Sequence, residues 1–133
     1  MQQSEKELSK KKNRLNRILT KLGNGTVIVE GKHDLRFLKE ELGLSDVVTF
    51  AQLCYSRTDL DHSTRLYPMM DKDSGGEQKK EQIRAILSEQ CPGVSPDYNA
   101  VEQFFRVVGV KRVEEACRSV RRILEAQESD YYG

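Results

Sequence analysis

Hydrophobic positions along this chain alternate between helical spacing and short continuous runs. Leucine and isoleucine recur at helical spacing between 8 and 22, at positions 8, 15, 18, 19 and 22, with Lys and Arg between them. This pattern predicts an amphipathic helix that ends at the glycine-rich turn 23–25. The next run, TVIVE at 26–30, is apolar and rich in β-branched side chains without alternation. Such a run is typical of a strand covered on both faces in a parallel sheet.

The rest of the chain continues the alternation of strands and helices. We expect further strands at 47–50 and 65–71 and helices at 34–43, 77–90, 98–108 and 113–127. A short helix within 51–64 and a short fourth strand near Val94 are weaker expectations, and Ser74-Gly75-Gly76 is expected to form a tight turn. Pro68 is unusual for a strand, because proline donates no ladder hydrogen bond. The pattern predicts an α/β fold with a small parallel sheet flanked by helices.

Length and composition indicate one globular domain in a reducing compartment. The chain has 133 residues, of which 37% are hydrophobic, and a second core would need roughly 100 residues more. Cys54, Cys91 and Cys117 are odd in number and far apart, which argues against a disulfide framework and against a zinc site. The polar N-terminus and the lack of an apolar run of about 20 residues predict a cytoplasmic protein without a membrane anchor.

The charge distribution is uneven along the chain. Residues 1–22 contain seven Lys and Arg against Glu5 and Glu7, and a second basic stretch covers 106–122, whereas the net charge is only +1. Basic flanks around an acidic middle favour a polyanionic partner such as nucleic acid. The alternative interpretation, solvated helix faces without a partner, is equally compatible with the charges alone.

Acidic side chains follow two of the predicted strands. The first strand ends at Glu30, and the third ends at Asp71-Lys72-Asp73. The carboxyl ends of parallel strands meet at one edge of a sheet, and residues i and i+2 of an extended chain point the same way, roughly 6.5 Å apart. We therefore expect Glu30, Asp71 and Asp73 to form one divalent-metal site. Oxygen ligands without a Cys or His pair favour Mg²⁺ over zinc or iron.

The two segments that carry these acids resemble a known family. TVIVEGKHD (26–34) and PMMDKDSGGE (68–77) are similar to the two signature motifs of the Toprim domain, which occurs in bacterial-type primases, topoisomerases, OLD-family nucleases, recombination mediators and the ribonucleases that mature 5S rRNA. The likeness is strongest to small standalone, archaeal-type Toprim proteins and extends to GVKRVEE (109–115). It implies a Rossmann-like Toprim core at 23–112, preceded by the basic helix 1–22 and followed by a helix at 113–127. The last residues, 128–133, have no apolar periodicity and are expected to form a flexible tail.

The resemblance assigns roles to individual residues. It implies that Glu30 is a metal ligand and the catalytic acid or base, and that Asp71 and Asp73 ligate one or two Mg²⁺ ions, for which Mn²⁺ can substitute. The expected phosphate-binding residues are Gly31, Lys32 and Gly76, and Glu77 matches an additional acid of the family. Many members carry a basic residue where this chain has Ser74 and a threonine where it has Met70, so the first difference removes an expected phosphate contact.

These expectations leave several function classes open. The first is a Mg²⁺-dependent Toprim enzyme that acts on nucleic-acid phosphodiesters by hydrolysis or nucleotidyl transfer, with RNA favoured. The alternative is a noncatalytic module that binds metal and nucleic acid. A third is a subunit of a larger nucleic-acid-processing complex, with the N-terminal helix as the docking surface for a protein partner.

Overall fold

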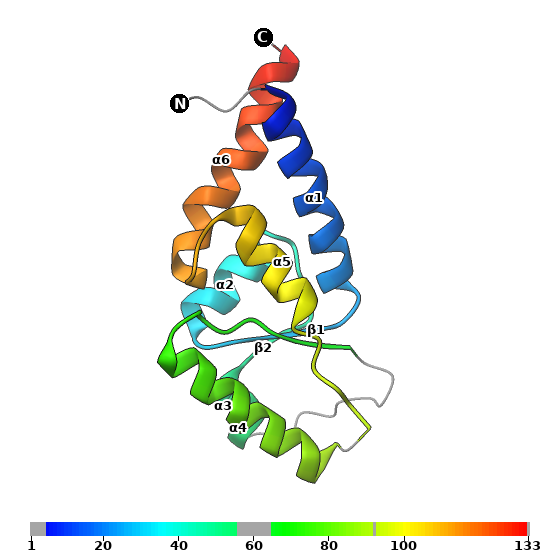
Figure 1. The fold of residues 1–133 in the computed structure, drawn as a ribbon, viewed down its shortest axis with the longest axis vertical. Coiled ribbons are helices and arrows are strands. Elements are labelled where there is room, and N and C mark those ends of the chain that lie inside the picture. The colour runs from blue at the N-terminus through cyan, green and yellow to red at the C-terminus, as the bar shows by residue number, and fades with distance from the viewer. Residues whose placement is uncertain (1–4, 56–64, 92, 133) are drawn as a thin grey trace.

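The sheet at the centre of the molecule is small and entirely parallel. The computed structural model describes residues 5–55, 65–91 and 93–132, and Figure 1 shows their arrangement. Three strands, β1 (Thr26–Val29), β2 (Val47–Thr49) and β3 (Leu66–Pro68), pair in the order β2-β1-β3. The fold class predicted from the sequence, an α/β fold with a small parallel sheet flanked by helices, is therefore confirmed.

Helices cover both faces of this sheet. They are α1 (Glu5–Gly23), α2 (Lys32–Glu40), α3 (Phe50–Tyr55), α4 (Ser74–Gln90), α5 (Asn99–Val108) and α6 (Val113–Tyr132). The larger core cluster joins α1, α2, α5 and α6 to one face, and the smaller cluster joins α3 and α4 to the other. Among the described residues, no helix combines the length and the apolar character needed to cross a membrane.

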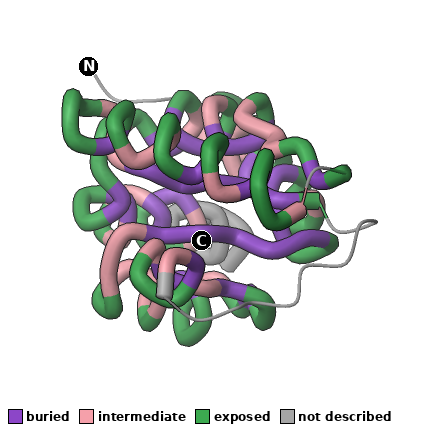
Figure 2. The backbone as a smooth tube through the Cα atoms, turned by 90° about the horizontal axis from the view of Figure 1, so that it is seen from below, coloured by how far each residue is buried: buried purple, intermediate pink, exposed green. Residues whose placement is uncertain are grey.

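The central strand contributes to both cores, which explains its continuous apolar sequence. Val27 and Val29 belong to the larger cluster, whereas Ile28 belongs to the smaller one, and all three are fully buried. Successive side chains of a strand point to opposite faces, so a strand with helices on both sides needs apolar residues at every position. In Figure 2 the buried stretches run through the middle of the molecule, and the exposed turns of the helices lie outside.

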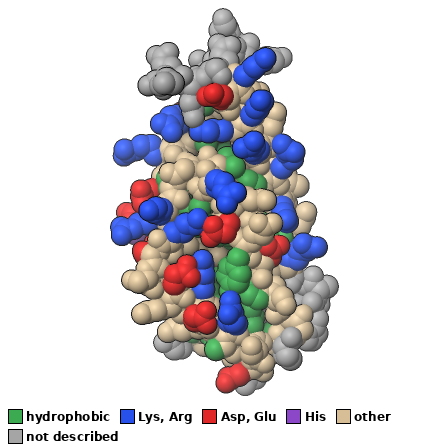
Figure 3. Space-filling model, in the orientation of Figure 1, with side chains coloured by type: hydrophobic (Ala, Val, Ile, Leu, Met, Phe, Trp, Pro, Cys, Tyr) green, Lys and Arg blue, Asp and Glu red, His purple; other side chains and the backbone are tan. Residues whose placement is uncertain are grey.

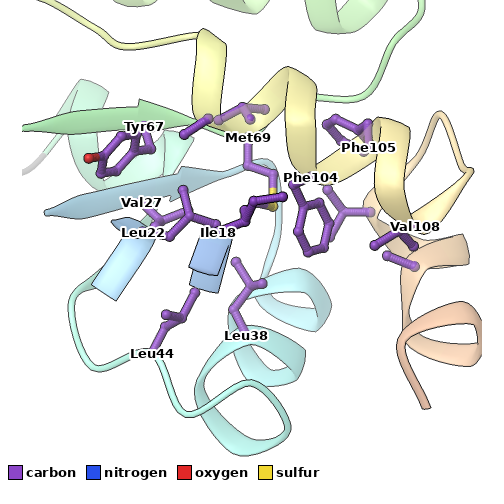
Figure 4. Packing of buried hydrophobic residues seen from close by; sticks show 14 of the residues in the cluster. Ile18, Leu22, Val27, Leu38, Leu44, Tyr67, Met69, Phe104, Phe105 and Val108 are labelled. Atoms are coloured by element: carbon purple, nitrogen blue, oxygen red, sulfur yellow. The ribbon is translucent and has the colours of Figure 1, made fainter. Parts of the chain in front are cut away.

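The basic N-terminal helix is an integral part of this domain. Leu15, Ile18 and Leu22 of α1 are buried in the larger cluster, where α1 packs against α5 and α6. Figure 4 shows Ile18 and Leu22 beside Val27 and close to side chains of α2 and α5. The apolar face of α1 is thus occupied within the chain, which leaves its basic face for any partner.

Helix boundaries differ from expectation where glycines and acids lie next to a helix start. α4 begins at Ser74 rather than at 77, so the residues expected to form a tight turn are its first turn, capped by Asp73. α2 likewise begins at Lys32 instead of 34. α6 ends at Tyr132 rather than at 127, so most of the segment expected to be a tail is helical. The short helix expected within 51–64 corresponds to α3, and residues 56–64 lie outside the described part of the chain.

The third strand is shorter than predicted and lies at an edge of the sheet. Met69 N donates to Ile28 O at 2.8 Å, so the alternating backbone of β3 turns the Pro68 nitrogen away from β1. An edge strand tolerates proline on its unpaired side. On that outer side an isolated parallel bridge joins Leu66 to Pro96. The described residues form this bridge in place of the fourth strand that was expected near Val94.

Candidate functional site

A pocket opens at the carboxyl edge of the sheet, where β1 and β3 end side by side. Glu30 directly follows β1, and Asp71 follows β3 after two buried methionines. The pocket has a volume of about 400 Å³, and its lining consists of Glu30, Gly31, His33, Asp34, Asp71, Lys79 and Glu114. The structure thus brings two of the three predicted metal ligands together at the edge where parallel α/β sheets bind ligands.

Glu30 is held as an anion in this pocket. Its Oε1 accepts a hydrogen bond from Lys79 Nζ at 2.6 Å, and its Oε2 accepts one from the Asp71 backbone N–H at 3.4 Å. Burial acts to raise the pKa of Glu30, but the hydrogen bonds from Lys79 and Asp71 and the positive charge of Lys79 outweigh it and lower the pKa. Glu30 is therefore ionised at neutral pH and able to accept a proton or a cation.

Asp71 shows the opposite behaviour. Burial raises its pKa to about 6, opposed by a hydrogen bond from the Val113 backbone N–H and reinforced by the adjacent carboxylates of Glu30 and Asp34. The Val113 N–H donates to Asp71 Oδ1 at 2.9 Å, which ties the start of α6 to this edge of the sheet. Asp71 therefore holds its proton more tightly than an isolated aspartate does, whereas Glu30 is the ionised member of the pair.

Asp34 adds a third acid to the pocket. Burial and the charge of Glu30 raise the pKa of Asp34, and a hydrogen bond from the Gly31 backbone N–H acts against them. Asp34 lies in the first turn of α2, where a carboxylate interacts favourably with the helix dipole. The negative charge in the pocket is thus larger than Glu30 and Asp71 alone supply.

The raised pKa of Asp71 predicts a pH-dependent gain in stability for Asp71→Asn. The folded protein binds the Asp71 proton more tightly than the unfolded chain does, so this carboxyl's contribution to stability is full below its ordinary pKa of 3.8 and is lost as the pH rises through about 6. In chelator at about pH 8, Asn should raise the free energy of unfolding by about 1 to 2 kcal/mol and the melting temperature by about 3 to 8 °C.

Thermal unfolding at two pH values checks this expectation. The difference between Asp71→Asn and wild type should disappear near pH 4, because Asp71 is then largely protonated in the folded protein. Glu40→Gln removes the same charge from an exposed position of α2 and serves as the control. An equal effect of Asp71→Asn at both pH values would show that the pocket does not disfavour the charge.

Asp73 is not among the lining residues of the pocket and has contacts of its own. Its Oδ1 accepts a hydrogen bond from the Gly76 N–H at 2.8 Å as the N-cap of α4, and its Oδ2 lies 3.9 Å from Arg112 Nε. The prediction assumed extended backbone from Asp71 to Asp73, but β3 ends at Pro68 and the cap turns this carboxylate over the first turn of the helix. Among the described residues, no three His, Cys, Asp or Glu side chains are arranged to hold one metal ion.

The predicted phosphate-binding glycines have different surroundings. Gly31 lines the pocket, and a Cβ built on it would meet nothing within 4 Å, so its backbone is open to a ligand. Gly76 is buried, and a Cβ there would lie 1.8 Å from the Asp71 carbonyl oxygen. Gly76 therefore allows α4 to approach the backbone at Asp71, which positions the Asp71 carboxylate instead of exposing the Gly76 backbone to a phosphate.

The two charged residues expected near the phosphate lie outside the pocket lining. Lys32 is exposed at the first position of α2. Glu77 is in the first turn of α4 and pairs with Lys80 at 3.1 Å.

Lys79 is the functional candidate that sequence reasoning missed. Ser74 occupies the position after the second aspartate, where many Toprim proteins have a basic residue. Lys79, further along α4, supplies a cation to the pocket instead. Its pKa is raised, first by the hydrogen bond to Glu30 and then by the charges of Glu30, Asp71 and Asp73, so it stays protonated. Helical geometry was the signal that could have identified Lys79, because a helix that begins at Ser74 turns some of its side chains towards the sheet edge.

The donor chemistry of the pocket fits magnesium held by two carboxylates. Mg²⁺ is commonly bound through one or two protein carboxylates, with water and phosphate oxygens completing its coordination. Glu30 and Asp71 supply such a pair, and the charge of Glu30, which helps to raise the pKa of Asp71, marks a position where a cation is favoured. Comparisons with known proteins give no significant match to any family model, curated protein or solved structure.

Proposed function

We propose that this protein is a Toprim-type, magnesium-dependent enzyme that hydrolyses nucleic-acid phosphodiester bonds. The observation that supports the proposal is the Glu30–Asp71 carboxyl pair at the carboxyl edge of β1 and β3, in a pocket of about 400 Å³. The resemblance of 26–34 and 68–77 to the Toprim motifs points to the same chemistry. The free cysteines Cys54, Cys91 and Cys117 fit our placement of this activity in a reducing compartment such as the cytoplasm.

The residues of the pocket suggest which catalytic role each of them would have. Glu30 and Asp71 would hold Mg²⁺, which when bound neutralises charge on a phosphate and its leaving oxygen. Glu30, ionised by its contact with Lys79, has the carboxylate oxygens that would accept a proton from an attacking water. The Lys79 ammonium, with 37% of its side chain exposed, can turn from Glu30 to a phosphate oxygen. The open backbone at Gly31 allows a substrate to approach closely.

A noncatalytic role is the second candidate, and two contacts favour it. The cap formed by Asp73 removes one expected ligand from the pocket, and Lys79 provides the counter-charge that Glu30 would otherwise need from a cation. With two carboxylates neutralised internally, the same fold could bind nucleic acid without cleaving it. The two candidates differ in whether the bound nucleic acid is cleaved when a divalent cation is added.

An assay on purified protein separates these candidates. Labelled RNA and DNA, each single-stranded and duplex, are incubated with Mg²⁺, with Mn²⁺ or with EDTA, and the products are resolved by size. We expect cleavage of RNA in Mg²⁺ and Mn²⁺ that stops in EDTA. Binding of all four substrates without any new product, equally in EDTA, would contradict the proposed hydrolysis and favour the noncatalytic module.

A further inference from the structure

Basic residues on α1 form one stripe along its exposed side. Lys10, Arg14, Arg17 and Lys21 follow one another at intervals of four, three and four residues, so they lie on the same face of the helix. Both arginines are exposed. The stripe is separate from the buried apolar face and is available to a partner.

A groove between α1 and α5 brings a third arginine to this stripe. Its volume is about 390 Å³, and its lining consists of Arg14, Arg17, Ile18, Gln103, Arg106 and Val107. Three guanidinium groups from two helices thus surround one polar depression. Like charges gathered in this way repel each other, so the groove favours an anion that can contact more than one of them.

Two arginines of α6 line a second depression. This depression of about 550 Å³ lies beside Val110 and includes Arg118 and Arg122, together with Glu114 and Glu115 at its acidic end. Figure 3 shows Lys and Arg side chains gathered over the half of this face that α1 and α6 form, with Asp and Glu side chains mostly over the other half. We call Arg14, Arg17, Arg106, Arg118 and Arg122 the arginine face.

The arginine face lacks the carboxylate partners that four other arginines of the described residues have. Arg65, Arg84, Arg112 and Arg121 each lie within 4.0 Å of a carboxylate oxygen. Among the described residues, no member of the arginine face makes such an ion pair, and Arg17 has only a 3.5 Å hydrogen bond from its Nε to the Asn13 carbonyl. These five guanidinium groups therefore keep their hydrogen-bonding capacity for an external ligand.

We infer that the arginine face binds the phosphate backbone of nucleic acid, at a surface separate from the Glu30–Asp71 pocket. Guanidinium groups match phosphate oxygens with two parallel hydrogen bonds, and several of them along two adjacent grooves suit a repeated phosphate better than a single small anion. A lipid surface fits less well, because membrane-binding helices present large apolar residues beside the basic ones, and the apolar residues of α1 are in the core.

The arginine face is connected to the pocket by one short segment. After α5 ends at Val108, Lys111 O accepts a hydrogen bond from Lys72 N at 2.7 Å, and the Val113 N–H donates to Asp71 at 2.9 Å. A strand bound on the arginine face would pass next to this segment. The inference rests on the proposed function only in taking nucleic acid as the partner, and it adds the surface where that partner is held.

Binding measured in EDTA tests the inference separately from catalysis. Affinity of a fluorescent single-stranded RNA is measured against salt for wild type and for the triple variant Arg14→Gln, Arg17→Gln, Arg106→Gln. All three changes are exposed and break no described ion pair, and circular dichroism verifies the fold. We expect at least a tenfold weaker affinity at about 0.1 M salt and a salt slope smaller by about two, since each lost phosphate contact removes about 0.7 from it for a single strand.

A matched control and a second ligand make the outcome decisive. Arg36→Gln, Lys39→Gln, Arg84→Gln removes the same charge from α2 and α4 and should leave affinity and slope near wild type. Equal losses in both variants, or none in either, would overturn the inference. So would a loss confined to vesicles rich in phosphatidylserine, which would assign the face to membranes. Loss of RNA binding in the arginine variant alone supports it even if no cleavage is ever detected.

Discussion

Gly76→Ala is expected to destabilise the protein by about 3 kcal/mol or more, one of the largest effects of any single substitution near the pocket. The added Cβ would lie 1.8 Å from the Asp71 carbonyl oxygen and 2.8 Å from its carbon. Both are backbone atoms, so no side-chain rotation relieves the overlap, and α4 must move away from the loop that carries Asp71. Thermal unfolding should show a melting temperature lower by roughly 10 °C.

Gly75→Ala is the matched control for this prediction. A Cβ at Gly75 would lie 3.5 Å from the Asp73 carboxylate, an ordinary contact, and the position is exposed in the same helical turn. Alanine has a higher helix propensity than glycine, so this variant should be as stable as wild type or more stable by up to about 1 kcal/mol. Equal melting temperatures for the two variants would show that Gly76 is not needed for the close approach.

Glu30→Gln is expected to lower Mg²⁺-dependent cleavage by a factor of about 10² to 10⁴, the range for loss of a catalytic acid or base. Glutamine can still accept the hydrogen bond from Lys79 but has no charge to bind a cation and no basicity to accept a proton. The variant should fold normally, because a partly exposed ion pair contributes at most about 1 kcal/mol. It should also lose the magnesium-induced rise in melting temperature, which for wild type corresponds to about 2.7 kcal/mol at a hundredfold excess over the dissociation constant.

The neighbouring acid Glu77 provides the comparison for Glu30. Glu77 pairs with Lys80 outside the pocket, so Glu77→Gln should retain both cleavage and the magnesium-induced shift. Full activity in Glu30→Gln would remove this residue from the mechanism. An unchanged magnesium shift in Glu30→Gln would mean that the ion binds elsewhere in the molecule.

Local sequence patterns were sufficient to predict the sheet and the edge at which the pocket lies. The continuous apolar run of β1 required cover on both faces, and the parallel pairing of β1 with β3 then brought Glu30 and Asp71 to one edge. Boundaries were less predictable at Ser74, because a capping aspartate lets a helix begin at residues whose composition is typical of a turn.

Side-chain direction at the pocket depended on contacts between distant parts of the chain. The hydrogen bonds of Glu30 with Lys79 and with Asp71 join residues 49 and 41 positions apart, and that of Asp71 with Val113 spans 42 positions. No periodicity within one segment encodes such pairs. The capping role of Asp73 was not predicted for this reason, because its carboxylate is directed by the start of α4 rather than by the strand before it.

The sequence by itself determined the α/β class, the buried central strand, the acids at the ends of two strands and the basic character of α1, because each depends on short-range spacing. Only the tertiary structure decided which of these groups meet. It paired Glu30 with Lys79, turned Gly76 from an expected phosphate contact into a packing position, and placed Arg106 of α5 beside the arginines of α1. Packing of the helices on the sheet sets these distances, and that packing depends on the whole core.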